Sequence, residues 1–163
     1  DMLKIGPQLM DRIPHSLLIV TPQKYNQVHE ENNLNAIKAK LHNQAYINLA
    51  KKINLPSFKI IDQFTPESSY YRYLKNEPQI VRSIHFETKA EDKYLSVAVG
   101  SIISRYGFLK TWQEMEQKYD INFPKGSGDK VDILAQEFVD RYGFERLGEV
   151  AKLHFKNTEK IRV

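Results

Sequence analysis

Apolar and small residues occupy nearly every position between residues 94 and 103, the stretch around which the rest of the chain is organised. A helix with apolar residues on all its faces is typical of an element surrounded by protein. The charged residues 87–93 precede it, and the helix is predicted to begin near Ala90 and to continue to about Tyr119. We therefore expect the carboxylates of Glu91 and Asp92 at the mouth of a buried helix.

A second helix is predicted over residues 34–53, because apolar residues recur there at steps of three and four. Lysines occupy its other side and Asn33 stands at the N-cap position, which is the pattern of an amphipathic helix packed on a sheet. His42 lies beside the apolar stripe. It could act as a metal ligand or a base, although the pattern favours a structural histidine. The predicted stripe consists of Leu34, Ile37, Leu41, Ala45, Leu49 and Ile53.

Three apolar runs have the length and composition of strands. Residues 15–20 form the first, residues 58–61 form the second, which Asp62 closes, and residues 79–86 form the third. The helix between the first two runs favours their parallel pairing. Asp62 would then lie at the carboxyl end of a strand, where open α/β sheets usually carry their sites. The third strand would return the chain to the same edge just before Glu91.

The remaining segments complete an α/β arrangement in which helices cover a sheet. A short helix is predicted from about Gln8, after Gly6-Pro7, and residues 23–33 are predicted to form a polar loop. Thr65-Pro66-Glu67 predicts the start of a helix rich in tyrosine, in which core packing is favoured over stacking on bases. The C-terminal part is predicted to consist of a glycine-bearing turn (122–128), two helices (around 131–139 and 147–153) and a basic tail.

The composition narrows the class of protein. The chain has 163 residues and no internal repeat or low-complexity linker, so residues 1–163 are predicted to form a single domain. The absence of cysteine excludes disulfides, thiolate nucleophiles and zinc sites of the cysteine type. No apolar stretch approaches the roughly 20 residues that span a bilayer, so we expect a soluble, cytoplasmic monomer that binds no membrane. A net charge of +4 suits a polyanionic partner.

Asp62 and Glu91 are the candidate metal ligands. A carboxylate at a strand end that faces a carboxylate at a helix start can share a divalent cation. Alternatively, Glu91 and Asp92 are ordinary acidic residues of a first helical turn, where the helix dipole favours them. Lys125 precedes a glycine in the turn 122–128 and could grip a phosphate, but the full P-loop pattern is missing and a simple loop is the commoner interpretation.

Several motifs together resemble a known family. They are Thr88-Lys89-Ala90-Glu91-Asp92-Lys93-Tyr94, Ser101-Ile102-Ile103-Ser104-Arg105, Ile61-Asp62-Gln63-Phe64, Pro124-Lys125-Gly126 and Lys152-Leu153-His154-Phe155-Lys156-Asn157-Thr158. With these, the chain resembles bacterial ribonuclease HIII over essentially its whole length. The resemblance implies a ribonuclease H fold and a metal-dependent endonuclease that hydrolyses the RNA strand of RNA/DNA hybrids. It also implies Mg2+ or Mn2+ held by four carboxylates.

The same resemblance assigns roles to single residues. Asp62 matches the third acid of the family and Glu91 the fourth, so both are expected to be catalytic and to bind metal. Lys89, Ser101 and Lys125 are the candidates for substrate binding, with the two lysines expected to contact phosphates.

The chain departs from the family pattern in one respect. The first two acids of the family lie in an Asp-Glu-Ser-Gly-Lys-Gly motif, which does not occur here. The family's N-terminal domain, similar to the TATA-binding protein, is missing as well. We therefore expect the C-terminal part of such an enzyme, with half of its metal site and no metal-dependent cleavage by itself. The family's first strands would be absent too, which would leave the apolar face of the 94–103 helix exposed. A non-catalytic nucleic-acid-binding module is the alternative. A small-molecule enzyme is disfavoured, since no glycine-rich cofactor loop follows a strand.

Overall fold

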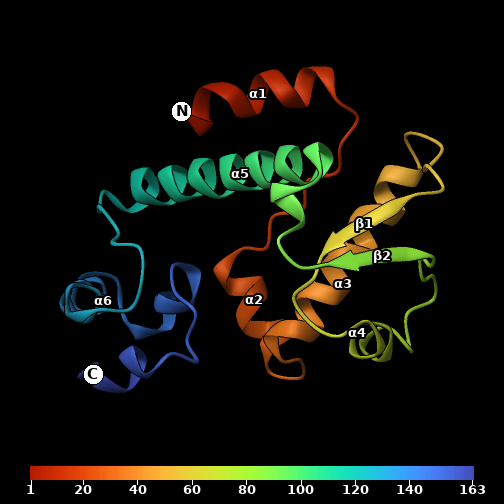
Figure 1. The fold of residues 1–163 in the computed structure, drawn as a ribbon. Helices are drawn as coiled ribbons and strands as arrows, with labels where there is room; N and C mark the ends of the chain where they lie inside the picture. Colours follow the sequence, from red (N-terminus) through yellow and green to blue (C-terminus); the bar gives the residue numbers. More distant parts are fainter. The chain divides into compact units, whose positions relative to one another are not determined.

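The computed structural model describes residues 1–163, which form several helices and one small parallel sheet (Figure 1). This arrangement confirms the predicted α/β class. The helices are α1 (Met2–Arg12), α2 (Pro22–His29), α3 (Leu34–Ala50), α4 (Glu67–Tyr73), α5 (Leu95–Tyr119) and α6 (Asp129–Tyr142). The strands are β1 (Lys59–Asp62) and β2 (Ile84–Glu87), and the short 3-10 helices are η1 (Ala90–Asp92), η2 (Phe144–Glu149) and η3 (Lys156–Lys160). No helix combines the length and hydropathy needed to cross a membrane.

The chain divides into two compact units. The first comprises residues 1–19 and 32–110, and the second comprises residues 20–31 and 111–163. The first contains the sheet with α1, α3, α4 and most of α5, and the second contains α2, α6 and the two C-terminal 3-10 helices. The single domain expected from the sequence remains a prediction.

In the first unit, β1 and β2 pair in parallel, with Asp62 opposite Glu87. The predicted parallel pairing across the helix 34–53 is wrong, because the chain crosses over through α4 instead. Side chains alternate across the strands, so one face of the sheet carries Ile61, Ile84 and Phe86, and the other carries Ile60, Asp62, His85 and Glu87. The apolar face contributes to a core of Ala39, Ile61, Tyr70, Leu74 and Ile84. The complete burial of Tyr70 agrees with the packing role expected for the tyrosines.

A tyrosine hydroxyl occupies the outer edge of β1. The Tyr46 hydroxyl donates to the Ile60 carbonyl at 2.6 Å and accepts from the Ile60 N–H at 3.1 Å. In a parallel pair, alternate residues direct their backbone groups away from the partner strand. The Tyr46 hydroxyl therefore bonds backbone groups that no third strand takes up within residues 1–163.

The third predicted strand, residues 79–86, is shorter in the structure and begins only at Ile84. The Asn43 side chain of α3 donates to the Gln79 carbonyl and accepts from the Val81 N–H. Ser83 has a φ of 59°, which interrupts the extended backbone. A buried side chain on α3 thus takes the hydrogen bonds that a strand neighbour would otherwise make.

Helix α3 begins at the predicted N-cap, where the Asn33 side chain accepts from the Ala36 N–H at 2.9 Å. The buried face differs from the predicted stripe, since Leu34 is 45% exposed while Asn43 is buried. The helix packs small residues such as Ala39 against the sheet, which brings the two elements close together. The buried residues of α3 are Ala36, Ile37, Ala39, Asn43 and Ile47.

The N-terminal segment differs from the prediction in two places. Helix α1 begins at Met2, capped by the Asp1 side chain, and includes Pro7, so a helix starting only at Gln8 was wrong. Gly6 packs directly against Tyr106 of α5, and Figure 1 shows α1 lying beside α5. Residues 15–20 form no strand, because no neighbouring strand bonds their backbone.

The predicted polar loop 23–33 is mostly helix α2, in the second unit. The Thr21 side chain accepts from the Lys24 N–H and Pro22 occupies the first helical turn, which together start the helix. The Thr-Pro pair is thus a helix-start signal that the prediction of a loop overlooked.

Helix α5 ends at Tyr119 as predicted but begins at Leu95, after the separate 3-10 turn η1, rather than near Ala90. Lys89 has a left-handed backbone, with φ 54° and ψ 38°, so it stands outside any helix that follows. Of residues 94–103 only Ile103 is buried, and Leu95 is 81% exposed. The stretch is therefore not surrounded by protein within these residues, which agrees with the exposure of its apolar face expected from the family pattern.

The second unit has its own core of Tyr119, Phe138, Val139 and Leu147. The turn 122–128 and the helix around 131–139 are confirmed, the latter as α6. The helix predicted around 147–153 is wrong, since only the 3-10 helix η2 forms there and it ends at Glu149. The Asn26 side chain donates one hydrogen bond to the Gly148 carbonyl and one to the Ala151 carbonyl.

Candidate functional site

Asp62 is the last residue of β1 and lies on the sheet face opposite the apolar core. Its carboxylate is exposed, and its Oδ1 accepts a hydrogen bond from the Ala90 N–H at 3.1 Å. Since β2 runs parallel to β1, the chain leaves β2 at the edge where Asp62 stands. The predicted return of the chain to the same edge is therefore confirmed, through the pairing with β2.

Glu91 directly follows the residue that donates to Asp62. It belongs to the 3-10 turn η1, is exposed, and is flanked by the buried Ala90 and the exposed Asp92. The hydrogen bond from Ala90 to Asp62 therefore holds the turn that carries Glu91 against the end of β1. Successive residues of a 3-10 helix point about 120° apart, so Glu91 and Asp92 face different directions.

The donor atoms are suitable for a hard divalent cation, but their number is small. Carboxylate oxygens are the ligands that Mg2+ and Mn2+ prefer. Among residues 1–163, however, no group of three or more His, Cys, Asp or Glu side chains is arranged to hold a metal ion. The carboxylate oxygens of Asp62 and Glu91 are thus the type of ligand that such an ion binds. Residues 1–163, however, do not assemble a complete coordination shell.

The three residues expected to bind substrate lie in different environments. Lys89 is exposed and next to Ala90, and so belongs to the same turn as Glu91. Ser101 is exposed on α5, where its carbonyl accepts from the Ser104 hydroxyl. Lys125 belongs to the second unit, where its Nζ lies 5.2 Å from the centre of the Trp112 ring. The structure brings Asp62, Lys89 and Glu91 together through one turn.

Glu87 is a residue that the sequence interpretation did not single out. Its carboxylate is bonded by Lys93, by His85 at 3.0 Å and by the Tyr94 hydroxyl at 2.9 Å. These bonds, that from Lys93 above all, lower the pKa of Glu87 to about 2. Glu87 pairs with Asp62 in the sheet register and so lies on the same face. Only the register could have revealed this, since the sequence alone shows one more acid in a charged run.

His42 is half-buried on α3, and its Nδ1 is 2.7 Å from the Lys38 carbonyl. Its ring packs 5.1 Å from the Phe64 ring, between centroids. Burial lowers the pKa of His42 below its usual range, so the neutral form is favoured. These contacts agree with the structural role that the sequence pattern favoured.

The sequence of this chain is similar to those of proteins of one known family. The sequence model of the ribonuclease HII family matches residues 2–158. The chain is 42% identical to ribonuclease HIII of Listeria monocytogenes over 164 residues, covering 98% of this chain and 53% of that protein. It is 43% identical to ribonuclease HIII of Bacillus anthracis over 160 residues, covering 96% and 51%.

Solved structures give the same picture. Bst-RNase HIII in complex with Mn2+ superimposes with a TM-score of 0.94 at 36% identity, covering 98% of this chain and 53% of that chain. Aquifex aeolicus RNase H3 superimposes with a TM-score of 0.59 at 26% identity, covering 82% and 46%. The chain thus spans about half the length of the relatives it matches.

Proposed function

The chain belongs to the ribonuclease HII family, and from that premise we propose that the protein containing it is a metal-dependent endonuclease that hydrolyses the RNA strand of RNA/DNA hybrids. The observation that carries the proposal is the hydrogen bond between the Asp62 carboxylate and the Ala90 N–H, which joins two acid-bearing segments at one sheet edge. Similarity to ribonuclease HIII proteins over 98% of the chain supports it.

We propose that Asp62 and Glu91 bind Mg2+ or Mn2+. When bound, such ions activate a water and stabilise the leaving oxygen of the phosphodiester. The Ala90 N–H fixes one oxygen of Asp62, so that the orientation of this carboxylate is set before any ion arrives. A solved complex of Bst-RNase HIII with Mn2+ supports the choice of a divalent ion. Exposed Lys89, on the same turn, is suited to contact a phosphate of the hybrid.

The number of acids limits what residues 1–163 can do by themselves. No cluster of three or more ligand side chains is present in these residues, and the relatives are about twice as long. We therefore propose that further ligands come from outside these residues, and that the 163 residues alone cleave no hybrid. The intact protein is proposed to act as a monomer in the cytoplasm, since its nucleic-acid substrates are intracellular.

A non-catalytic nucleic-acid-binding module is the second candidate. The same shortage of metal ligands favours it, as does the net charge of +4. It predicts binding of a hybrid without hydrolysis, whereas the endonuclease predicts hydrolysis that depends on the two acids.

Cleavage of a labelled RNA/DNA hybrid by the full-length protein distinguishes the two candidates. Asp62→Asn and Glu91→Gln should each lower the rate with Mg2+ or Mn2+ by about 100-fold or more, because each removes a charged ligand. Asp92→Asn is the matched control and should have a mild effect, since Asp92 points away from Glu91. Unchanged rates in both variants, or full activity from residues 1–163 alone, would show that other residues are the catalytic acids.

A further inference from the structure

The turn that carries Glu91 is held at two points. At its start, the Ala90 N–H donates to Asp62. At its end, Lys93 and Tyr94 both donate to the carboxylate of Glu87, the last residue of β2. The six residues 88–93 therefore form a closed loop between two carboxylates that pair in the sheet register.

This loop adopts a backbone that local sequence does not favour. Lys89 lies in the left-handed region, with φ 54°, which costs a residue with a Cβ about 1–2 kcal/mol. Only three residues, Ala90–Asp92, form the 3-10 helix that follows. So short a helix does not stabilise itself. Its conformation therefore depends on the contacts at its two ends.

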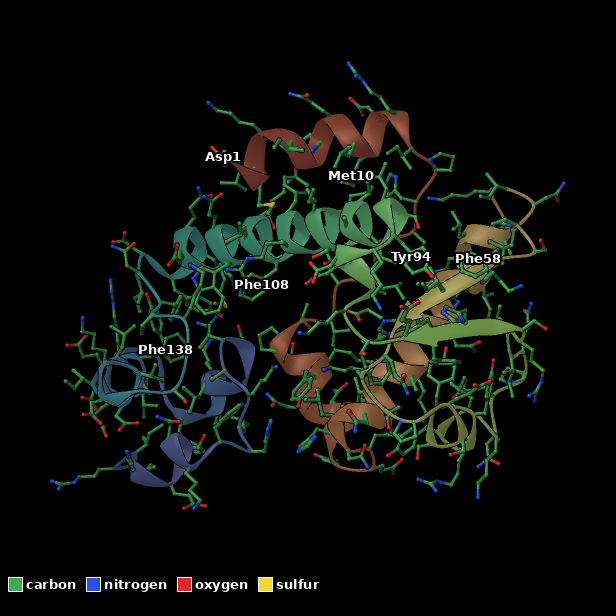
Figure 2. All side chains as sticks on the ribbon, viewed as in Figure 1. Asp1, Met10, Phe58, Tyr94, Phe108 and Phe138 are labelled. Atoms are coloured by element: carbon green, nitrogen blue, oxygen red, sulfur yellow. The ribbon has the colours of Figure 1, made fainter.

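The Glu87 contacts are more than one ion pair. An isolated surface ion pair is worth little, because water competes for both groups. Here Lys93, Tyr94 and His85 converge on a single carboxylate that is only 24% exposed. The Tyr94 ring also contacts the ring of Phe58, with centroids 5.8 Å apart. Figure 2 labels both residues beside the sheet. A carboxylate with several fixed partners holds its neighbours in one arrangement.

We propose that Glu87 is a positioning residue, which holds the 88–93 loop through Lys93 and Tyr94 and so presents Glu91 and the Ala90 N–H to the metal site at Asp62. The inference rests on the proposed function for the metal itself, but the loop geometry stands independently of it. Glu87 need not touch the ion. Its effect passes through the loop, as residues behind metal ligands commonly act.

The test compares Glu87→Gln with the wild type in the full-length protein. Glutamine keeps the size of the side chain but loses the charge that holds Lys93. Amide hydrogen exchange of Ala90, measured without metal, should become about tenfold faster or more, because its bond to Asp62 opens more often. The affinity for Mn2+ alone, measured by calorimetry, should fall by about 10- to 100-fold. The kcat on a hybrid should fall while KM changes little.

The second unit offers a matched control in Glu149. Its carboxylate also accepts from a tyrosine hydroxyl, from Lys118 and from an arginine, and it is 28% exposed. Bonds from Tyr119 and Arg146 lower the pKa of Glu149 to about 2, as for Glu87. Glu149→Gln should therefore cost similar thermal stability but leave Ala90 exchange and Mn2+ affinity unchanged. A general loss of stability cannot produce that contrast.

Variants of the lysine provide a second measurement. Lys93→Met should reproduce the effects of Glu87→Gln, whereas Lys93→Arg, which keeps a cationic donor, should retain most of the Mn2+ affinity. If Glu87→Gln does not fold, Tyr94→Phe removes a single hydroxyl and carries the same test in milder form. Ala90 exchange and Mn2+ affinity within about twofold of the wild type in these variants would overturn the role of Glu87.

One further variant separates this inference from the proposed function. If Asp62→Asn abolishes Mn2+ binding while Glu87→Gln leaves it intact, the metal site stands and the positioning role is refuted. If Asp62→Asn binds Mn2+ as tightly as the wild type, the proposed site is refuted. In that case, faster Ala90 exchange in Glu87→Gln would still support the role of Glu87 in holding the 88–93 loop.

Discussion

Lys89 has an unfavourable backbone conformation and is also a candidate for substrate binding. Its φ of 54° is one that glycine adopts freely and other residues adopt rarely. The sequence nevertheless places a lysine there, directly before the turn that carries Glu91. A lysine therefore occupies this position in spite of backbone strain, and strain of this kind is a reason to test the side chain as a ligand contact.

Replacing Lys89 with glycine should separate the effect of backbone strain on stability from the effect of the side chain on hybrid binding. Lys89→Gly is expected to raise the free energy of unfolding by about 0.5–1 kcal/mol, since it relieves the left-handed backbone. It should also weaken binding of the hybrid. Ser83→Gly is the matched control, because Ser83 has a similar φ of 59° and no charge. Denaturant titration and hybrid binding measure the two effects. Equal hybrid affinity in both variants would remove Lys89 from the binding surface.

His42 predicts a pH dependence of stability. Burial lowers the pKa of His42 from its ordinary value of 6.5. The unfolded chain therefore binds a proton at a higher pH than the folded chain, so stability is fully present above 6.5 and is lost as the pH falls. His42→Gln should reduce the drop in unfolding free energy between about pH 7.5 and about pH 5.5. Equal drops in the two proteins, measured by denaturant titration, would contradict this assignment.

At the scale of elements, the contact between α1 and α5 depends on the absence of a side chain at Gly6. A Cβ built at Gly6 would lie 2.5 Å from the Cβ and Cγ of Tyr106. By contrast, a Cβ at Gly100, on α5, would meet nothing within 4 Å. An alanine substitution at each of these two helical glycines therefore compares the effect of packing with the effect of helix propensity within one unit.

Gly6→Ala should lower the free energy of unfolding by about 1–3 kcal/mol, because the new methyl group overpacks the contact with Tyr106. Gly100→Ala should raise it by about 0.5–1 kcal/mol, because alanine loses less conformational entropy in a helix. Chemical denaturation of both variants provides the measurement. A neutral Gly6→Ala would mean that α1 does not pack on α5 in solution.

Local signals predicted those elements whose cause is local. The Asn33 cap, the end of α5 at Tyr119 and the closure of β1 at Asp62 all follow from residues within one or two turns. The run 15–20 was predicted as a strand and is not one, since a strand requires a partner that the run itself does not specify. The late start of the third strand, at Ile84 instead of residue 79, follows from Asn43, far away in sequence. No local pattern encodes that bond.

The candidate site was predictable to a similar extent. Asp62 and Glu91 were selected from motifs, and the structure joins their segments through Ala90. The part played by Glu87 was not predictable, since it depends on the register that pairs it with Asp62. The start of α5 at Leu95 also required the structure, because propensity does not reveal a left-handed Lys89.

At the scale of the whole molecule, the net charge of +4 gives a prediction that needs no knowledge of the site. If the protein binds a hybrid duplex, the logarithm of its affinity should fall linearly with the logarithm of salt concentration. The slope should be about −0.9 for each phosphate contact if the hybrid behaves like B-DNA. Fluorescence anisotropy over a salt series measures it. Affinity that does not change with salt would exclude nucleic acid as the partner.

The Tyr46 hydroxyl protects one edge of the small sheet from other chains. Unpaired strand edges are the places where sheets of separate chains join and grow into aggregates. Here Tyr46 bonds both backbone groups of Ile60, so an incoming strand must first displace this ring from its bonds. We therefore expect Tyr46→Phe to open a route to fibrous precipitation at high concentration of the chain.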